Sequence, residues 1–470
     1  MKSATRNYVF FFLGCVLFHV IGTWSVPLID RDEPRFAEAS REMIERGDYI
    51  VPRFNNQFRL DKPPLAYWAQ VASYRIFGEN DFAARFPSAI AAALVAMSIL
   101  AWGKRIGGDR VGWWAAIIFT LSLQTFIHAK AAVADTWLVL FVTLAHWAGY
   151  EIQRATWKWW FVFYVSLALG FLAKGPIAWT ALLTLGAYKF FVRDVDLLKR
   201  FKFIRGILLM LAIVALWGVP ALVQTHGEFF KIGIGRHVIG RSFSAMESHG
   251  SNSLWIYLLL LPFYFVTIFA SFFPWSIKLP SLTKKLWRDR DQVDIYLLCG
   301  AGVIFVIFTL IKTKLPHYTL PAFPLLALLV ARHLDSERFL NSAATFAICL
   351  YLALAIFAAP FAAQFFPAAQ LYQQARIDLK AEMEFGAVDF QEPSLVWYFR
   401  SRVKGWMTAL KPKNATEFMQ RNGARFIILP TSDVSKTFPD LPGTWKIFTA
   451  SGFNVAKGKD VDLALVLKPE

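Results

Sequence analysis

The chain has 470 residues, 56% of them hydrophobic, and carries a formal net charge of +17. Apolar runs close to the roughly 20 residues that a helix needs to cross a bilayer recur along its first three-quarters, which excludes an ordinary soluble protein. The basic residues are spread over short loops and are not gathered in one soluble region, so the sequence predicts no nucleic-acid partner.

Eleven apolar segments predict a polytopic, all-α membrane domain over residues 1–362. They lie near residues 8–28, 82–102, 111–129, 137–152, 159–173, 176–192, 203–222, 254–273, 293–311, 318–332 and 342–362. Lysine and arginine cluster in every second connection, beginning with Lys2 and Arg6. The positive-inside rule places these connections in the cytoplasm and the others outside it. The first segment lacks a small-residue cleavage site, so we interpret it as an uncleaved helix and not as a signal peptide.

The first connection on the outer side, residues 29–81, holds the densest charge of the chain. It contains the segments RDEPRFAEASREMIERGDYIVPRF and LDKPPLAYW. Pro34 suits the first turn of a helix and Gly47 suits a helix end, with apolar and charged residues on opposite faces between them. Pro63 and Gly78 bound a second stretch of the same kind. The pattern predicts two amphipathic helices that lie on the membrane surface.

Residues 363–470 differ from the rest of the chain, because polar residues are more frequent and no apolar run is long enough to span a bilayer. The segments RFIILP and DLALVL are typical of buried strands, and residues 415–422 of a helix. The sequence therefore predicts a small C-terminal α/β domain, which the alternation of the spans places outside the cytoplasm.

Ionisable residues gather near the outer ends of the predicted spans. They are Asp32, Glu33, Arg35, Asp61, Lys62, Lys130, Asp135, Lys174, Lys312, Lys314 and His317. Charges this close to hydrocarbon are costly and commonly functional, although any single one could instead reach the interface with its side chain. Asp135 interrupts the apolar segment HAKAAVADTWLVLF and is either catalytic or a helix cap. Lys174, in FLAKGPIAW, is either a phosphate ligand or a turn residue.

Four segments, in the same order, resemble motifs of the integral-membrane GT-C glycosyltransferases that use polyprenyl-phosphate-linked sugars. They are the charged first loop, AVADTWLVL, LAKGPIA and IKTKLPHYTLPAFPLLALL. The nearest resemblance is to the bacterial transferases that place aminoarabinose on lipid A, which are related to the protein O-mannosyltransferases. The resemblance covers residues 8–335 and implies a GT-C fold.

The resemblance also implies a reaction: transfer of a sugar from a polyprenyl (undecaprenyl) phosphate donor to a hydroxyl or phosphate of a glycolipid or protein acceptor. The site would face the outer side of the cytoplasmic membrane. Asp32 and Asp135 would be the catalytic carboxylates, with Asp32 as the base that takes the proton of the acceptor. Cationic side chains would hold the departing phosphate, namely those of Arg35, Lys62, Lys174 and Arg241. The substrate pocket would include Glu33, Asp61, Arg236, His237, Lys312, Lys314 and Tyr318.

This interpretation requires no cofactor, but Asp61 and His249 are candidates for binding a divalent metal ion. A transporter or flippase for the same lipid is the alternative function, and it would explain the cations equally well. It predicts paired charges at mid-depth along the spans, where this sequence has very few. A membrane anchor for the C-terminal domain would leave the charged cluster unexplained.

Overall fold

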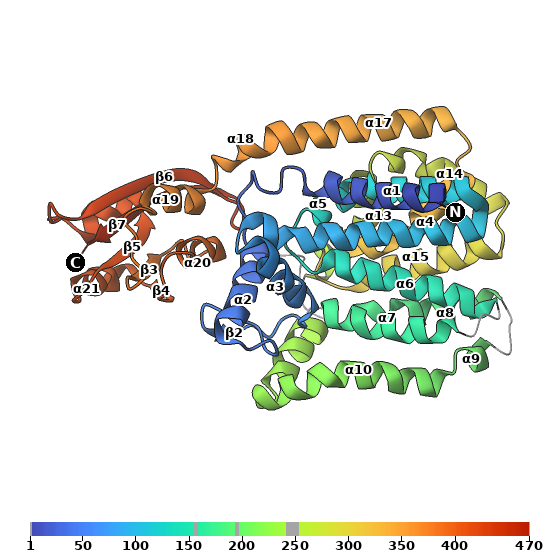
Figure 1. Ribbon diagram of the computed structural model, residues 1–470, viewed down its shortest axis with the longest axis horizontal. Helices are drawn as coiled ribbons and strands as arrows, with labels where there is room; N and C mark the ends of the chain where they lie inside the picture. Colours follow the sequence, from blue (N-terminus) through green and yellow to red (C-terminus); the bar gives the residue numbers. More distant parts are fainter. Residues whose placement is uncertain (1, 155–157, 193–196, 241–252, 470) are drawn as a thin grey trace.

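The computed structural model describes residues 2–154, 158–192, 197–240 and 253–469. It consists of a helical body and a smaller α/β unit at one end of that body (Figure 1). The long helices of the body run roughly side by side, and the short helices α2 (Asp32–Arg46) and α3 (Leu65–Phe77) lie at the end that faces the α/β unit.

The remaining helical elements of the body follow the apolar segments of the sequence. The α-helices are α1 (Lys2–Val20), α4 (Asp81–Thr120), α5 (Leu123–Ala129), α6 (Asp135–Gln153), α7 (Trp159–Lys174), α8 (Thr180–Phe191), α9 (Leu197–Arg200), α10 (Phe203–Gln224), α12 (Leu254–Leu259), α13 (Phe263–Ser271), α14 (Leu279–Arg288), α15 (Gln292–Leu310), α16 (Phe323–His333), α17 (Glu337–Ala353) and α18 (Ala359–Ala363). Tighter or wider helical turns are η1 (Pro176–Trp179), η2 (Phe230–Gly240), η3 (Trp275–Lys278), η4 (Pro316–Ala322) and η5 (Leu354–Ala358).

Four helices among the described residues are long and apolar enough to cross a membrane by themselves. They are Asp81–Thr120, Phe203–Gln224, Gln292–Leu310 and Glu337–Ala363. A multi-pass membrane protein is therefore confirmed, whereas the number of eleven spans stays a prediction. Several predicted spans are built from two shorter pieces, as α12 and α13 are, so helix length alone does not count them.

The longest helix, α4, contains the second predicted span and the first part of the third, which meet at a turn. Gly108 has a φ of 81° in the middle of it, a left-handed conformation that glycine adopts without a steric cost. A Cβ atom on Gly103 would lie 2.7 Å from the Cα of Gly112, so the two halves approach more closely than side chains would allow. The turn therefore reverses the chain between the second and third predicted spans.

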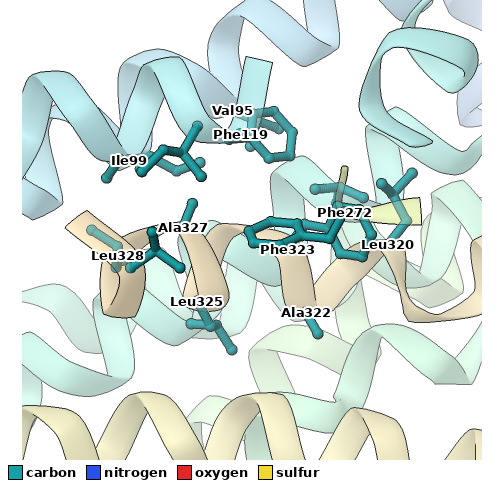
Figure 2. Close-up of a cluster of buried hydrophobic side chains, with 14 of the residues drawn as sticks. Val95, Ile99, Phe119, Phe272, Leu320, Ala322, Phe323, Leu325, Ala327 and Leu328 are labelled. Atoms are coloured by element: carbon teal, nitrogen blue, oxygen red, sulfur yellow. The ribbon is translucent and has the colours of Figure 1, made fainter. Parts of the chain in front are cut away.

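The core of the body is centred on α16, which packs against α4 and against other helices of the body. Figure 2 shows Phe323 beside Phe272, whose ring lies edge-on at 5.0 Å between centroids, with Ile99 and Phe119 of α4 opposite. These side chains are at most 1% exposed. This dense apolar packing fixes where α16 begins, and the 316–322 turn that precedes it carries residues of the candidate site.

The α/β unit has a five-stranded sheet with the order β4-β3-β5-β7-β6. Its strands are β3 (Glu384–Val388), β4 (Met407–Leu410), β5 (Arg425–Pro430), β6 (Lys446–Asn454) and β7 (Lys459–Lys468), and β1 (Arg53–Phe54) and β2 (Gln57–Phe58) form a separate hairpin in the body. Strands β4, β3 and β5 are parallel, and β7 is antiparallel to both of its neighbours.

The helices of this unit are short: α19 (Pro367–Ala375), α20 (Pro393–Phe399), α21 (Ala415–Gln420), α22 (Val434–Thr437), η6 (Pro412–Asn414) and η7 (Thr431–Asp433). The two strands and the helix expected from the sequence are thus present, as β5, β7 and α21. The division of the chain into residues 1–362 and 363–470 stays a prediction.

Helix α2 differs from its prediction, because its charged face does not point to water. Glu38, Arg41 and Glu42 are at most 2% exposed, since α20 of the α/β unit covers them. Arg400 contacts Glu38 and donates a 2.7 Å hydrogen bond to Glu45, and the Arg41 guanidinium lies 3.9 Å from the centre of the Trp397 ring. A charged face predicts exposure only when no partner elsewhere in the chain can pair with it.

Candidate active site

A polar cavity of about 290 Å³ opens where α2, α6 and the 315–318 segment meet the α/β unit. Its walls are formed by Asp30, Arg31, Asp32, Arg35, Phe36, Asp61, Lys62, Val133, Ala134, Asp135, Lys174, Leu315, His317, Tyr318, Val455 and Ala456. The last two belong to the turn between β6 and β7, and Arg31 donates a 3.2 Å hydrogen bond to the carbonyl of Ala456. The C-terminal unit therefore closes one side of this cavity.

A second cavity, of about 530 Å³, is predominantly apolar and extends between the helices of the body. Leu138, Ile177, Leu183, Ile307 and Phe308 are among the side chains that line it. The two cavities share five residues, which therefore stand at the junction between an apolar channel and a polar chamber: Lys62, Asp135, Lys174, His317 and Tyr318.

Asp135 is the first residue of α6, and its side chain does not cap that helix. Its Oδ1 accepts a 2.5 Å hydrogen bond from the Lys174 ammonium, which the end of α7 presents, and lies 3.9 Å from His317 Nε2. Burial lowers the pKa of His317 well below its usual range, against the attraction of the Asp135 carboxylate, so this imidazole is neutral. The local geometry favours the functional interpretation of Asp135 over the capping one.

Asp32 stands at the start of α2, in the wall of the polar cavity, and Glu33 beside it points elsewhere. The Glu33 carboxylate accepts hydrogen bonds of 2.8 and 2.7 Å from Arg85 and one of 2.7 Å from the Ala132 amide. Glu33 is 5% exposed and does not line the cavity, in contrast to its predicted place in the substrate pocket. Its ion pair instead anchors the first turn of α2, which positions Asp32.

Asp61 and Lys62, which follow the first predicted helix of the outer loop, line the polar cavity. Arg59 contacts the Asp61 carboxylate and an aromatic ring. Its Nε lies 3.0 Å from an Asp61 oxygen, and its guanidinium lies 4.8 Å from the centre of the Phe36 ring. The Lys62 ammonium lies 3.8 Å from the other Asp61 oxygen. A buried arginine therefore balances the carboxylate, and Lys62 faces both cavities.

Of the remaining predicted site residues, two lysines line neither cavity, and four residues have side chains outside the described part of the structure. Lys314 donates to the carbonyls of Phe308 and Thr309 at the end of α15, which is a helix-capping role, and Lys312 does not line either cavity. Arg236 and His237 fall in η2, but their side chains are outside the described part of the structure, as are the whole of Arg241 and His249.

Two contributions to the site were not predicted from the sequence. His128, at the end of α5, has its ring 4.8 Å from that of His317, centre to centre. It occurs in the same apolar segment as Asp135, seven residues earlier, and that proximity was the available signal. The turn residues Val455 and Ala456 carried no signal, because only the tertiary fold brings them to the cavity.

Comparisons with a family model, with protein sequences and with solved structures give concordant results. Residues 61–218 match the family model described as dolichyl-phosphate-mannose-protein mannosyltransferase. The chain is 32% identical over 314 residues to the undecaprenyl phosphate-alpha-4-amino-4-deoxy-L-arabinose arabinosyl transferase 2 of Sodalis glossinidius, covering 64% of this chain and 55% of that one. The corresponding transferase of an Enterobacter species is 30% identical over 345 residues, which cover 71% of this chain and 60% of that one.

The crystal structure of ArnT from Cupriavidus metallidurans bound to undecaprenyl phosphate superposes with a TM-score of 0.79 at 18% sequence identity, covering 99% of this chain and 98% of that one. The resemblance to GT-C glycosyltransferases is confirmed. The GT-C fold extends over nearly the whole chain, including the α/β unit. The chain spans a little over half the length of the two arabinosyl transferases that it matches in sequence.

Proposed function

We propose that this protein is a membrane glycosyltransferase that moves a sugar from a polyprenyl phosphate carrier to a hydroxyl or phosphate acceptor. The observation that carries the proposal is the junction of the two cavities at Lys62, Asp135, Lys174, His317 and Tyr318. A polyprenyl chain requires an apolar channel, whereas its phosphate, the sugar and the acceptor require a polar chamber. The names of the similar transferases include undecaprenyl phosphate, which supports the same donor class.

The proposed roles follow from which side chains border the junction. Lys62 and Arg35 border the polar chamber and, with Lys174, would bind the phosphate, whose negative charge increases as the sugar leaves. Asp32, which lines the polar chamber, would accept the proton of the acceptor. Asp135 would position Lys174 through their 2.5 Å contact.

We further propose that eleven spans cross the cytoplasmic membrane and that both cavities open on its outer side. The basic loops support this orientation, because they lie at the opposite end of the body (Figure 1). There Arg105 pairs with Glu151 at 2.6 Å, and Arg332 pairs with Asp294 at 2.9 Å. Because basic loops remain in the cytoplasm, the end that carries Asp32 and Asp135 faces outward.

The flippase alternative differs in what happens to the bond between sugar and phosphate. The test is to reconstitute the purified protein in lipid vesicles with undecaprenyl phosphate-aminoarabinose and lipid A, and to follow both lipids by mass spectrometry. A transferase yields undecaprenyl phosphate and a glycosylated acceptor, and Asp32→Asn strongly slows the formation of both products. Movement of intact donor across the bilayer without bond cleavage would instead identify a flippase.

A further inference from the structure

Two imidazoles and one carboxylate converge in the wall between the two cavities. The potential ligand atoms of His128, Asp135 and His317 all lie within 4.8 Å of one another. They come from three separate elements, the end of α5, the start of α6 and the 316–322 turn, so no local helix geometry forces them together. Their side chains are sheltered: that of His317 is 22% exposed and that of Asp135 is 11% exposed.

The donor set has the chemistry of a transition-metal site. Imidazole nitrogen together with carboxylate oxygen is a common ligand combination for zinc and related divalent ions, at distances of about 2.0–2.2 Å. Ligand atoms on such an ion lie about 3.5 Å apart in a tetrahedron. The contact of 3.9 Å between His317 Nε2 and Asp135 Oδ1 is near that value, and the ligand atom of His128 lies within 4.8 Å of both.

The surroundings of His128 orient it for this role. Its Nδ1 lies 3.2 Å from the carbonyl oxygen of Gln124 and 2.9 Å from the side-chain amide nitrogen of the same residue. Because Nδ1 is engaged there, Nε2 is the atom left to bind a ligand. Metal-binding histidines commonly have their second nitrogen fixed by a backbone carbonyl in this manner.

Lys174 is the competitor of a metal ion at this site. Its ammonium lies 2.5 Å from the Asp135 oxygen, so it occupies one position on the carboxylate and adds a like charge next to the cation. A divalent ion held by the three ligands would therefore weaken the Lys174–Asp135 pair and release the ammonium toward the polar cavity, whose wall Lys174 also forms.

From this geometry we propose that His128, Asp135 and His317 form a binding site for a divalent transition-metal ion of the zinc type, with Lys174 as its internal competitor. The ion would sit in the shared wall, with its open coordination positions toward the cavities, because Asp135 and His317 line both of them and His128 lines neither. The site is distinct from the pair Asp61 and His249 considered from the sequence. It does not depend on the proposed sugar transfer.

The test measures metal binding directly and in the absence of any substrate. The protein is purified in detergent, stripped with a chelator and dialysed against Zn²⁺, and the bound zinc is counted by elemental analysis. Co²⁺ is then used as a spectroscopic probe, since its visible absorption reports nitrogen and oxygen ligation. The variants are His128→Gln, His317→Gln, Asp135→Asn and Lys174→Gln, and His226→Asn, an exposed histidine in the loop after α10, is the matched control.

We expect one zinc per wild-type chain, loss of that ion in the three ligand variants, and unchanged binding in His226→Asn. Lys174→Gln should bind the ion more tightly, by roughly tenfold or more, because the like charge and the competing hydrogen bond are both removed. Misfolding cannot produce tighter binding, so this variant separates a metal site from a folding defect. Wild-type binding no stronger than that of His317→Gln, or weaker binding in Lys174→Gln, would overturn the proposal.

Discussion

Asp135 and Asp32 are both carboxylates at the beginning of a helix, but their surroundings differ. Asp135 is tied to Lys174, whereas Asp32 faces the polar cavity beside Glu33, which Arg85 holds in place. A carboxylate that is already paired is suited to positioning a cation, and one that faces the acceptor is suited to taking its proton. The environment of each residue therefore assigns them different roles in the proposed reaction.

The first prediction compares their asparagine variants. Asp32→Asn should slow sugar transfer by about 10²–10⁴-fold, because the amide cannot accept the proton. Asp135→Asn should slow it less, through loss of the charge that positions Lys174. Asparagine caps a helix about as well as aspartate, so a capping role for Asp135 predicts wild-type turnover. Turnover is measured as undecaprenyl phosphate released by protein whose thermal midpoint and elution profile match those of the wild type.

The second prediction concerns donor binding by Lys62, whose ammonium faces both cavities. Lys62→Ala should raise the donor concentration needed for half-maximal rate by roughly tenfold to a hundredfold, since a charge-assisted contact contributes about 1.5–3 kcal/mol. Lys312→Ala is the matched control, because Lys312 lines neither cavity and should leave donor dependence unchanged. Equal donor dependence in the two variants would remove Lys62 from the phosphate site.

At the scale of elements, one carboxyl group of the segment before α2 contacts the start of α20. Asp30 accepts a 2.8 Å hydrogen bond from the Ser394 amide and a 2.5 Å one from its hydroxyl. Burial raises the pKa of Asp30 to about 7, although these two hydrogen bonds favour the charged form. The contact between the helical body and the α/β unit is therefore sensitive to pH.

The third prediction is the pH dependence of that contact. In the unfolded chain the Asp30 pKa is about 4, so the folded protein binds the proton more tightly. The contribution of Asp30 to the free energy of unfolding is greatest below pH 4 and declines as pH rises to about 7, by at most about 1.4 kcal/mol per pH unit. Asp30→Asn removes this decline. Its thermal midpoint should match the wild type below pH 4 and exceed it at pH 8, and a constant difference would contradict the assignment.

The fourth prediction concerns the packing of α10 against α7. A Cβ atom on Gly206 would overlap the ring of Tyr164, whereas one on Gly218, in the same helix, would touch only Val214 at 4.0 Å. Gly206→Ala should therefore destabilise the protein by about 1–3 kcal/mol, as overpacking does, and Gly218→Ala should not. The measurement is thermal unfolding in detergent. Equal midpoints for the two variants would mean that α10 does not pack on α7 at Gly206.

At the scale of the whole molecule, charge separates the two ends of the helical body. The candidate site and the α/β unit occupy one end, and ion pairs from basic loops, such as that between Lys285 and Asp335, occupy the other. The two cavities meet at the residues of the candidate site, so the proposed chemistry takes place on a single side of the membrane. The α/β unit shares that side because Ala456 reaches the polar cavity.

The fifth prediction tests this orientation with single cysteines in a background where Cys15, Cys299 and Cys349 are replaced. Gln57→Cys and Ser432→Cys, both at exposed positions, should react with an impermeant thiol reagent added from outside the cell. Ser281→Cys, exposed on α14, should react only after the membrane is opened. Labelling of Ser281→Cys and Gln57→Cys from the same side would contradict the proposed topology.

The sequence by itself determined the class of protein, most helices and the motifs of the site. Apolar runs near the length of a bilayer require a membrane protein, because unpaired backbone groups cannot remain in hydrocarbon. The same local logic predicted α3 from Pro63 and Gly78. It also predicted that four charged residues lie at one end of the helical body, namely Asp32, Lys62, Asp135 and Lys174. These features depend on composition and on neighbours within one or two helical turns, which a single sequence displays.

Only the tertiary structure decided which charges pair and which remain open to substrates. Glu38 was expected to face water but is buried by Arg400, which lies 362 residues away along the chain. Glu33 pairs with Arg85, and His128 reaches His317, through contacts between separate helices. The free energy of a buried charge depends on the partner that the fold brings to it and not on sequence neighbours, so these assignments could not be predicted from sequence patterns.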